Sequence, residues 1–507
     1  MSRSDTTHLI CPLTATTPES MVAAMGQAVA AGATAVEYRL DFLADTPTGA
    51  DLTRMLTDVP VPTIVTYRPA RQGGRYDGDE AARLALLARA SELGATWIDV
   101  EDDVPLADRP AGATIMSYHN FDSLPADVAD RARAIAAQPA AINKLACNVQ
   151  RPAEAMAMLD LIDATTKPTI ALAMGEAGVL TRILAHRCGA TGTFGALSAE
   201  TGSAPGQPTL DEFTRLYRFN RLSAQAEVYG VVGCPVGHSM SPAIHNAAFD
   251  ALACDAVYLP LLVEPGEASF SRLMDAMTAR PQLGFRGLSV TIPHKENALA
   301  WVGADCCDEL SASIGAINTI TLSPDGTVSG TNTDYAAAID ALCSAMDIER
   351  AGLAHYRVAV IGAGGEARAI VAALNHYGCA PTIYNRTLSR AQTLADRFGG
   401  VALPLDEADS LNAQIVINCT PIGMHPEVDA CPLSAIPPMV QVVFDTIYNP
   451  LETQLLAMAR RAGLKTVSGI EMFVNQAVAQ FELWTHRDAP RNVMRTVVLE
   501  RLGQSNA

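Results

Sequence analysis

The 507-residue sequence has no apolar run long enough to cross a membrane, since a spanning helix needs roughly 18 such residues. Its first residues lack the basic flank, apolar segment and small-residue cleavage site of a secretory signal. Its eleven cysteines have no metal-binding spacing, and their odd number and scatter indicate reduced thiols. We therefore expect a cytoplasmic protein without a bound metal ion.

Basic residues are also few, with 36 Lys and Arg against 54 Asp and Glu and a net charge of −18. This balance argues against nucleic acids and anionic membranes as partners, but a few inward-facing arginines could still bind a small anionic substrate. A hydrophobic content of 49% with 18% charged residues is typical of a globular protein. The length predicts more than one domain. No internal repeat or low-complexity tract is present.

Short β-branched runs alternate with Ala-rich helical stretches through the first 200 or so residues. The candidate strands are Leu9–Ala15, Ala35–Leu43, Pro62–Arg68, Trp97–Glu101, Thr114–His119, Ile142–Cys147, Thr169–Met174 and Thr193–Leu197. Most intervening stretches have the length of a crossover helix. Periodicity alone also allows an open doubly wound sheet, and the count of eight strands favours a (β/α)8 barrel.

The pattern starts again near Ala226, where we place a domain boundary. A strand at Val228–Val232 opens a second α/β series. Further on, Tyr356–Gly365 reads as a strand that runs directly into a glycine-rich turn. The second half is therefore predicted to contain a substrate lobe and a nucleotide lobe.

Polar side chains gather at the predicted carboxyl ends of the first eight strands, where barrels bind their ligands. They are Glu37, Arg39, Asp41, Arg68, His119, Lys144, Arg182 and the segment Ser203–Gln207. Alternation within a strand places Glu37, Arg39 and Asp41 on one face. Singly, each has an ordinary explanation, such as an edge lysine, a core histidine or a structural ion pair. Their convergence at one barrel mouth favours a site.

A lysine among arginines in a desolvated pocket can lose its proton and attack a ketone. The protonated imine that results would acidify the neighbouring C–H bond. His119 could take that proton and return one to a leaving hydroxyl. Arg182 suits a substrate carboxylate through a bidentate contact.

The strings VEYRLDF, TYRPARQGG, SYHNF, NKLA, GVLTR and SAPGQ resemble type I 3-dehydroquinate dehydratase across residues 8–222. The resemblance implies Lys144 as the Schiff-base lysine and His119 as the proton-transfer residue. It implies as substrate-binding residues Glu37, Arg39, Arg68, Arg182, Ser203 and Gln207. Gln72 stands where members of the family commonly have Glu, so it is given no charge-based role.

In the second half, a strand followed by Gly362, Gly364 and Gly365 opens a helix, as in dinucleotide-binding turns. The next strand, Pro381–Tyr384, leads to Arg386. Because an arginine there suits a ribose 2′-phosphate, we favour NADP over NAD, with Arg390 as reinforcement.

The preceding lobe carries hydroxyls, amides and one Lys–Asp pair that suit a polyhydroxylated acid. The hydroxyls of Ser239 and Ser241 could reach a carboxylate. Asn318 and Asp334 could reach ring hydroxyls. Lys295 could pass a proton to the oxygen that is being reduced, although Lys295 and Asp334 could also form an ordinary surface ion pair.

The strings VGHSMSP, SVTIPHKE, GAINT, NTD, GAGGEARA, NRT, NCTPIGM, DTIYNP and MFVNQA resemble shikimate dehydrogenase across residues 228–507. The resemblance implies Lys295 and Asp334 as the catalytic pair. Substrate contacts would come from Ser239, Ser241, Thr291, Asn318, Tyr448 and Gln476. Cofactor contacts would come from Gly362, Gly364, Gly365, Asn385, Arg386, Thr387, Arg390, Thr420, Gly423 and Gly469. Ser289 and Ala337 depart from the usual Asn and Gly.

The predicted domains are a barrel at 1–226, a substrate lobe at 227–337 and 468–507, and an NADP lobe at 338–467. The two implied reactions are consecutive, since dehydration of 3-dehydroquinate gives the ketone that NADPH reduces to shikimate. One alternative is a quinate-type dehydrogenase in the second half. Another is a catalytically silent metabolite sensor, which would not need all four of His119, Lys144, Lys295 and Asp334. A third is that only the nucleotide-binding lobe has been identified correctly and that the other motifs have no function.

Overall fold

The computed structural model describes residues 7–505, and its chain forms two compact units. The first unit runs to Ser239 and resumes over Asp255–Phe285. The second comprises Met240–Cys254 and the chain from Arg286 onward. Among the described residues, no helix is both long and apolar enough to cross a membrane.

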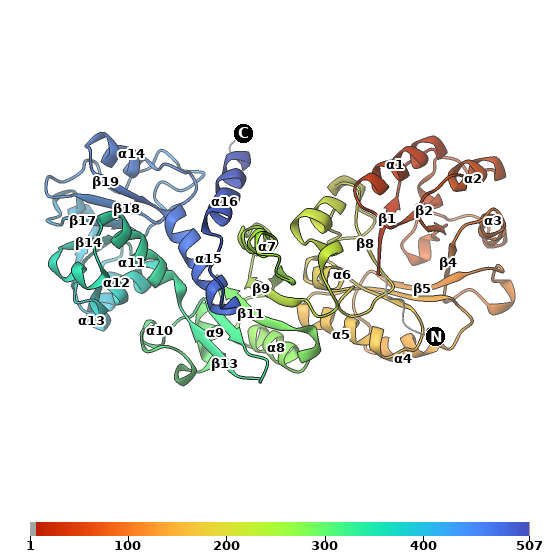
Figure 1. The fold of residues 1–507 in the computed structure, drawn as a ribbon, viewed down its shortest axis with the longest axis horizontal. Coiled ribbons are helices and arrows are strands. Elements are labelled where there is room, and N and C mark those ends of the chain that lie inside the picture. The colour runs from red at the N-terminus through yellow and green to blue at the C-terminus, as the bar shows by residue number, and fades with distance from the viewer. Residues whose placement is uncertain (1–6, 506–507) are drawn as a thin grey trace. The chain divides into compact units, whose positions relative to one another are not determined.

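Eight parallel strands form the barrel of the first unit (Figure 1). They are β1 (His8–Leu13), β2 (Ala35–Arg39), β3 (Thr63–Thr66), β4 (Trp97–Glu101), β5 (Thr114–Asn120), β6 (Ile142–Asn148), β7 (Thr169–Met174) and β8 (Gly192–Phe194). Strand β1 pairs with β8, and the order continues from β1 through β7. The backbone N–H of Thr191, just before β8, donates to the carbonyl of Thr169 at 2.9 Å. This bond bridges the seam between β7 and β8, and the predicted barrel is confirmed.

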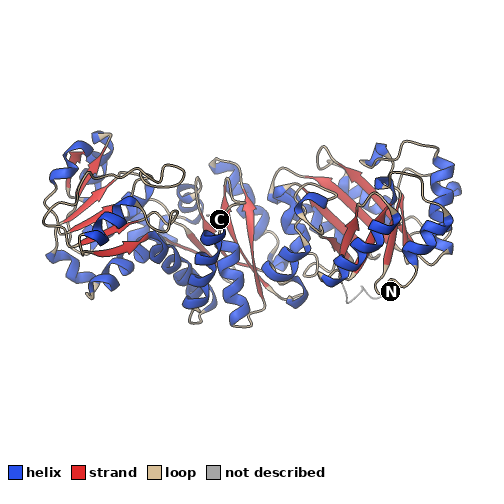
Figure 2. Ribbon diagram, turned by 90° about the horizontal axis from the view of Figure 1, so that it is seen from above, coloured by secondary structure: helices blue, strands red, loops and turns tan. Residues whose placement is uncertain are grey.

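Helices flank the barrel (Figure 2) and connect successive strands, except that β4 and β5 are joined by a loop with only the 3-10 turn Leu106–Asp108. They are α1 (Pro18–Ala30), α2 (Gly49–Leu56), α3 (Glu80–Glu92), α4 (Val128–Ala136), α5 (Pro152–Asp163) and the short α6 (Val179–Ile183). Helix α1 begins where Thr17 caps the backbone N–H of Ser20 and a proline occupies the first turn. Apolar side chains such as Ile64, Ile115 and Ile170 pack together in one buried cluster.

Strand β2 is shorter than predicted. It ends at Arg39, and Asp41 lies in a 3-10 turn over Leu40–Phe42. The prediction that Asp41 shares a strand face with Glu37 and Arg39 was therefore wrong. The turn folds the Asp41 carboxylate back onto the Arg39 guanidinium, with Nε and one terminal nitrogen donating at 2.9 and 2.8 Å.

The first unit also contains the parallel pair β9 (Glu227–Gly233) and β10 (Ala256–Leu262), followed by α8 (Glu267–Thr278). Arg280, just after α8, forms an ion pair at 2.7 Å with Asp160 on α5. The predicted limits of the domains do not coincide with those of the compact units. The domain limits themselves stay a prediction.

The second unit combines a small antiparallel sheet with helices that include the last two of the chain. Strands β11 (Phe285–Val290), β12 (Thr319–Leu322) and β13 (Val328–Thr331) pair in that order. The helices are α7 (Ser241–Ala251), α9 (Lys295–Val302), α10 (Glu309–Ile314), α11 (Thr333–Met346), α15 (Gly469–Thr485) and α16 (Arg491–Ser505).

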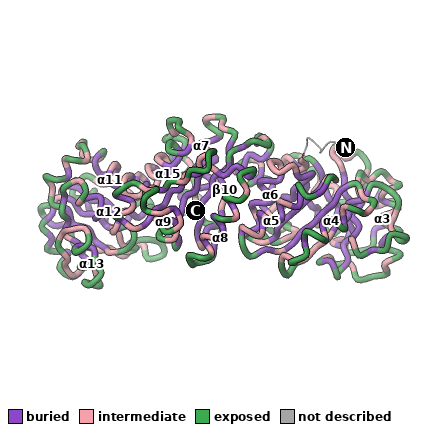
Figure 3. The backbone as a smooth tube through the Cα atoms, turned by 90° about the horizontal axis from the view of Figure 1, so that it is seen from below, coloured by how far each residue is buried: buried purple, intermediate pink, exposed green. Residues whose placement is uncertain are grey.

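A six-stranded parallel sheet completes the second unit in the order β16-β15-β14-β17-β18-β19. Its elements are β14 (Val358–Ile361), α12 (Gly365–His376), β15 (Thr382–Asn385), α13 (Leu388–Phe398), β16 (Val401–Pro404), β17 (Ile415–Asn418), β18 (Val442–Asp445), α14 (Gln454–Arg461) and β19 (Lys465–Ser468). Strands β14, β17 and β18 are buried along their whole length, and Figure 3 shows buried stretches of the backbone in purple. The order reverses at β14, as in Rossmann-type folds, and ligands bind at such a switch point.

Candidate active sites

A cavity lies in the barrel. All eight residues predicted for the dehydratase site line it: Glu37, Arg39, Arg68, His119, Lys144, Arg182, Ser203 and Gln207. Gln72, Phe121 and Phe194 also contribute to its wall. The structure therefore brings together side chains that are up to 170 positions apart in the sequence.

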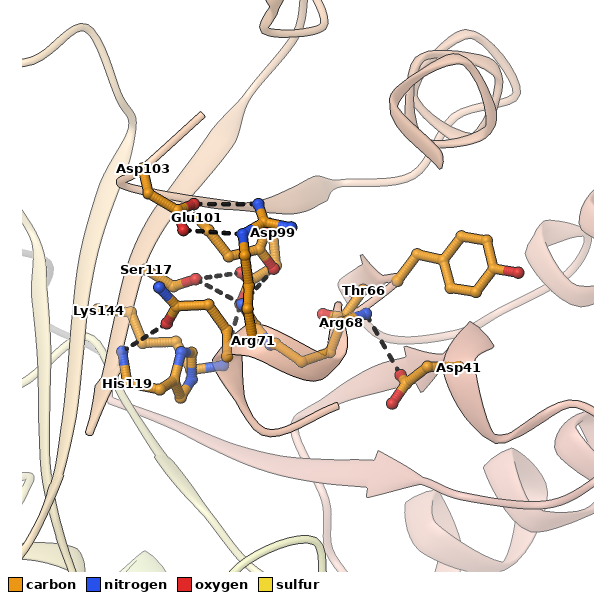
Figure 4. A network of polar contacts seen from close by, with 12 residues as sticks. Asp41, Thr66, Arg68, Arg71, Asp99, Glu101, Asp103, Ser117, His119 and Lys144 are labelled. Atoms are coloured by element: carbon orange, nitrogen blue, oxygen red, sulfur yellow. Dashed lines mark hydrogen bonds and ion pairs between the residues drawn. The ribbon is translucent and has the colours of Figure 1, made fainter. Parts of the chain in front are cut away.

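Lys144 lies on β6, where its side chain is buried beside Asp99 (Figure 4). Its Nζ is 3.0 Å from Oδ2 of Asp99 and 3.4 Å from Oε1 of Glu37. The ring of Phe194 lies on another side, with its centroid 4.5 Å from Nζ. The sequence predicted a lysine among arginines, but carboxylates are its nearest charged partners.

Arg68 is buried behind this lysine and contacts several acidic side chains. It forms ion pairs with Asp99 at 2.8 Å and Glu101 at 2.6 Å, and it donates to Oγ of Ser117 at 2.8 Å. Asp99, Glu101 and Ser117 were not predicted as site residues. The signal was present in WIDVE, where two acids alternate in an apolar strand as Glu37 and Arg39 do.

His119 ends β5 beside the lysine. Its backbone N–H donates to Oε1 of Gln72 at 3.1 Å, and its ring stacks with Phe121 at a centroid distance of 6.3 Å. Burial, together with the nearby charges of Arg68 and Lys144, holds the pKa of His119 well below its usual value. The imidazole is therefore neutral at physiological pH, which is the state required of a base.

Three buried polar atoms of the cavity have no hydrogen-bond partner among the described residues: Nδ1 of His119, Nε of Arg182 and Nε2 of Gln207. Burial lowers the pKa of Arg182 to about 10. By contrast, Arg39 and Arg68 are already paired with carboxylates. Arg182 is thus the arginine of this cavity best prepared for an incoming anion.

The segment Ser203–Gln207 (SAPGQ) forms a closed turn in the structure. The side-chain oxygen of Gln207 accepts from the backbone N–H of Ser203 at 3.0 Å and from its hydroxyl at 3.2 Å. This arrangement leaves the amide nitrogen of Gln207 available on the cavity wall.

In the second unit, Lys295 begins α9 and its Nζ donates to Oδ2 of Asp334 at 2.7 Å. Desolvation would lower the pKa of Lys295, but the charge of Asp334 and this hydrogen bond raise it overall. Lys295 is therefore a cationic proton donor at neutral pH. Asn332 caps α11 by accepting from the backbone N–H of Asp334, which fixes the carboxylate at the helix start.

Asn318 is buried next to this pair. Its amide donates to the hydroxyl of Thr333 at 3.0 Å, and its oxygen accepts from the backbone N–H of Thr333 at 2.8 Å. Gln480 of α15 donates to Thr319 and accepts from the hydroxyl of Ser289 at 2.7 Å. Ser289, which stands where the family usually has Asn, thus has Gln480 as a hydrogen-bond partner within the unit.

Tyr448 and Gln476 both contact Phe473 of α15. The Tyr448 ring stacks on Phe473 at a centroid distance of 5.0 Å, and Gln476 donates to the Phe473 carbonyl at 3.0 Å. Ala337, the second departure, is buried on α11, and its carbonyl accepts from Asn475. Of the remaining predicted substrate residues, Thr291 and Ser241 lie in this unit, whereas Ser239 ends the first segment of the other unit and keeps its role as a prediction.

The glycine-rich turn joins β14 to α12. Gly362 has a φ of +117°, and a Cβ there would lie 2.9 Å from the Cys419 carbonyl, so only glycine fits without strain. Gly364 and Gly365 have open space where a side chain would project. Thr420 lies beside Gly362 and donates to Oδ1 of Asn418 at 2.7 Å.

Two further glycines support the same end of the sheet. Gly423 has a φ of +97°. At Gly469 a Cβ would lie 2.1 Å from the Thr446 carbonyl, so α15 can start this close to β18 only from a glycine. Gly469 is thus explained by packing as well as by its predicted place near a cofactor.

Asn385 ends β15, Arg386 and Thr387 follow it, and Arg390 lies in the first turn of α13. The Asn385 side chain donates to the carbonyl of Thr387 at 2.8 Å, which orders the turn before α13. Arg386 and Arg390 are exposed, and neither forms a salt bridge with any residue from 7 to 505. They are free to bind phosphate.

Glu366, in the first turn of α12, was not singled out from the sequence. Its carboxyl accepts from the hydroxyl of Thr446 at 3.0 Å. The pKa of Glu366 is raised to about 7, by desolvation of its carboxyl group and then by repulsion from Asp334, although much of the residue is exposed. The helix dipole favours a carboxylate in the first turn of a helix, but the charge of Glu366 would oppose that of a phosphate bound at the same helix start.

Comparison with known families divides the chain in the same way as these two sites. A sequence model of type I 3-dehydroquinase matches residues 9–223. Models described as shikimate dehydrogenase substrate binding domain, shikimate/quinate 5-dehydrogenase and shikimate 5′-dehydrogenase C-terminal domain match residues 231–320, 345–425 and 469–499.

One relative spans both halves: the bifunctional 3-dehydroquinate dehydratase/shikimate dehydrogenase of Arabidopsis thaliana, named as chloroplastic. It is 38% identical over 96% of this chain and 83% of its own length. The chain belongs to this bifunctional family. A shikimate dehydrogenase (NADP(+)) of Moorella thermoacetica is 40% identical over 56% of the chain and 97% of its own length. The solved Thermus thermophilus shikimate 5-dehydrogenase, in complex with NADP(H) and shikimate, is 33% identical over 54% of this chain and 99% of that chain, with a TM-score of 0.47.

The dehydrogenase half of this bifunctional protein has residues that fit NADP. Helix α12 has no side-chain cap at its N-terminus, so its first N–H groups can bind phosphate next to the open space at Gly364 and Gly365. Arg386, predicted to contact the 2′-phosphate, is an exposed cation just after β15. Within the described part of the chain, no group of three His, Cys, Asp or Glu side chains is placed to hold a metal ion.

Proposed function

We propose that Lys144 and His119 dehydrate 3-dehydroquinate and that Lys295 and Asp334 then serve the NADPH-dependent reduction of 3-dehydroshikimate to shikimate. The observation that carries the first assignment is the barrel cavity, which combines a buried lysine, a neutral histidine and an arginine without a carboxylate partner. A substrate carboxylate on Arg182 would orient the ring toward Lys144.

In the dehydratase site, Nζ of Lys144 forms a bond to the ketone carbon. The protons that leave nitrogen end on the former carbonyl oxygen, which departs as water and leaves a protonated imine. His119 takes the proton from the adjacent carbon, and the electron pair moves toward the imine nitrogen. The hydroxyl one carbon further leaves with a proton from His119, and hydrolysis of the imine releases the product.

In the dehydrogenase site, NADPH supplies the hydride when bound. Lys295 hydrogen-bonds the ketone oxygen and gives it a proton as the carbonyl becomes an alcohol. Asp334 holds the ammonium at 2.7 Å and keeps it charged. Tyr448, Gln476 and Ser241 would orient the substrate, and Arg386 with Arg390 would select the 2′-phosphate of NADP.

The domain limits 1–226, 227–337 with 468–507, and 338–467 remain part of this proposal, as does a preference for shikimate over quinate. A cytoplasmic location is also proposed, supported by eleven cysteines that form no disulfide. Incubation of the purified chain with 3-dehydroquinate and NADPH should yield shikimate. Absence of both activities would favour the metabolite-sensor alternative, and faster turnover of quinate than shikimate would favour the quinate-type dehydrogenase.

A further inference from the structure

Asp99 is a fully buried acid that contacts the reactive nitrogen of the barrel site but has no part in the mechanism above. It lies on β4, and its Oδ2 is 3.0 Å from Nζ of Lys144 (Figure 4). It does not line the cavity, whereas Glu37 does. Asp99 therefore lies behind the lysine, where substrate would not displace it.

Three neighbours fix the Asp99 carboxylate. Ser117 donates to Oδ1 at 2.5 Å, Arg68 lies 2.8 Å from Oδ2, and Lys144 is the third partner. Burial alone would raise the pKa of Asp99, but the charges of Arg68 and Lys144 lower it overall. The carboxylate is thus ionised throughout the physiological pH range.

The charge on the lysine nitrogen is the same before and after the imine forms. An ammonium and a ketone give a protonated imine and water, so one positive charge remains at nitrogen. Only the protonated imine draws electrons strongly enough to acidify the neighbouring carbon. A fixed anion beside the nitrogen favours that form over the neutral imine.

We propose that Asp99 is the counter-ion of the imine on Lys144 and keeps that imine protonated during dehydration. This inference rests on the proposed function of Lys144. Glu37 is less suited to the role, because its Oε1 is 3.4 Å from Nζ and also accepts from the hydroxyl of Thr66 at 2.7 Å. The charged and titratable groups around the lysine are Glu37, Arg39, Arg68, Asp99, His119 and Arg182.

The test is Asp99→Asn in the full chain, which removes the charge and keeps the shape. Removal of an opposite charge this close lowers the pKa of a cation by about 1 to 3 units. The imine would then lose its proton at lower pH. Cyanoborohydride reduces protonated imines, so trapping of 3-dehydroquinate on Lys144, followed by mass spectrometry across pH, reports the protonated fraction directly.

For the wild type, trapping and dehydration should persist to alkaline pH. For Asp99→Asn, both should decline at a pH about 1 to 3 units lower. Asp130→Asn is the matched control, because Asp130 is exposed on α4 and its one ion pair among residues 7–505 is with the surface residue Arg133. It should retain the wild-type profile.

Two different failures are distinguishable. If the wild type traps no adduct on Lys144 at any pH, the proposed function fails. If the wild type traps an adduct and Asp99→Asn has the same pH profile, the counter-ion role is overturned. If circular dichroism shows that Asp99→Asn does not fold, Asp99→Glu is the second variant. It keeps the negative charge, so trapping and dehydration should persist to the same alkaline pH as in the wild type. If trapping and dehydration in Asp99→Glu instead decline at lower pH although the charge is retained, the counter-ion role of Asp99 is also overturned.

Discussion

We expect that replacement of Arg182 will weaken binding of 3-dehydroquinate and at the same time stabilise the folded barrel. Its side chain is 1% exposed, has a single hydrogen bond, at 3.3 Å to the Phe194 carbonyl, and has no carboxylate partner among the described residues. Burial lowers its pKa from 12.5 to about 10. Because a tenfold change in proton affinity is worth about 1.4 kcal/mol, the buried charge destabilises the free barrel by about 3 kcal/mol at neutral pH.

The sign follows from linkage. A base whose pKa is lower in the folded state opposes folding at every pH below that value, and the penalty disappears only as pH rises from about 10 toward 12.5. Arg182→Met removes the charge and keeps most of the volume. After loss of the hydrogen bond to Phe194, we expect a net gain of about 1 to 3 kcal/mol.

The same variant should lose affinity for 3-dehydroquinate. Two charge-assisted hydrogen bonds to a carboxylate contribute about 1.5 kcal/mol or more each, so KM should rise at least about 100-fold. Denaturant unfolding and steady-state kinetics of the dehydratase measure the two effects. Arg133→Met, an exposed control on α4, should change neither. An Arg182→Met protein that is less stable and has an unchanged KM would refute the reasoning.

Three further outcomes are expected. Lys144→Ala should abolish dehydration and leave the reduction of 3-dehydroshikimate nearly intact, and joint loss in coupled and separate assays would contradict independent sites. Arg386→Ala should weaken NADP binding by about 10- to 100-fold and NAD binding little, as measured by fluorescence titration; equal losses would remove Arg386 from the 2′-phosphate site. Because the pKa of Glu366 is about 7, its carboxyl is neutral below that pH and anionic above it, so NADP affinity should fall as pH rises through neutrality. Calorimetry should find this dependence abolished in Glu366→Gln, and a persisting dependence would point to another group.

The barrel could be predicted because buried parallel strands read as short β-branched runs. The predicted strand Trp97–Glu101 is β4 with the same bounds. The polar ends of these strands, including Lys144 and His119, were identifiable because barrel strands converge at one mouth. The length of β2 was not predictable, since the 3-10 turn depends on the Arg39–Asp41 pair that forms only in the folded chain.

The environment of Lys144 also required the structure. Which carboxylate faces a lysine depends on the register between parallel strands, and here Ser117 of β5 pairs with Lys144 of β6 and with Glu101 of β4. A period-two pattern gives the face of each residue but not its height relative to the next strand. For that reason Asp99 could be seen as inward-facing but not as the partner of Lys144. Glu366 was missed because its carboxyl acquires its character from Thr446 and Asp334, which lie far away in sequence.

The position of Lys144 between Glu37 and Asp99 also affects how easily other carbonyl metabolites in a cell can modify this lysine. Asp99 and Glu37 hold Nζ of Lys144 in place at 3.0 and 3.4 Å, so a small aldehyde or ketone can react with it only if it is itself held over this nitrogen. A carbonyl compound without a carboxylate would also gain nothing from Arg182. The barrel can therefore carry a lysine able to form imines while remaining resistant to adventitious modification by other metabolites.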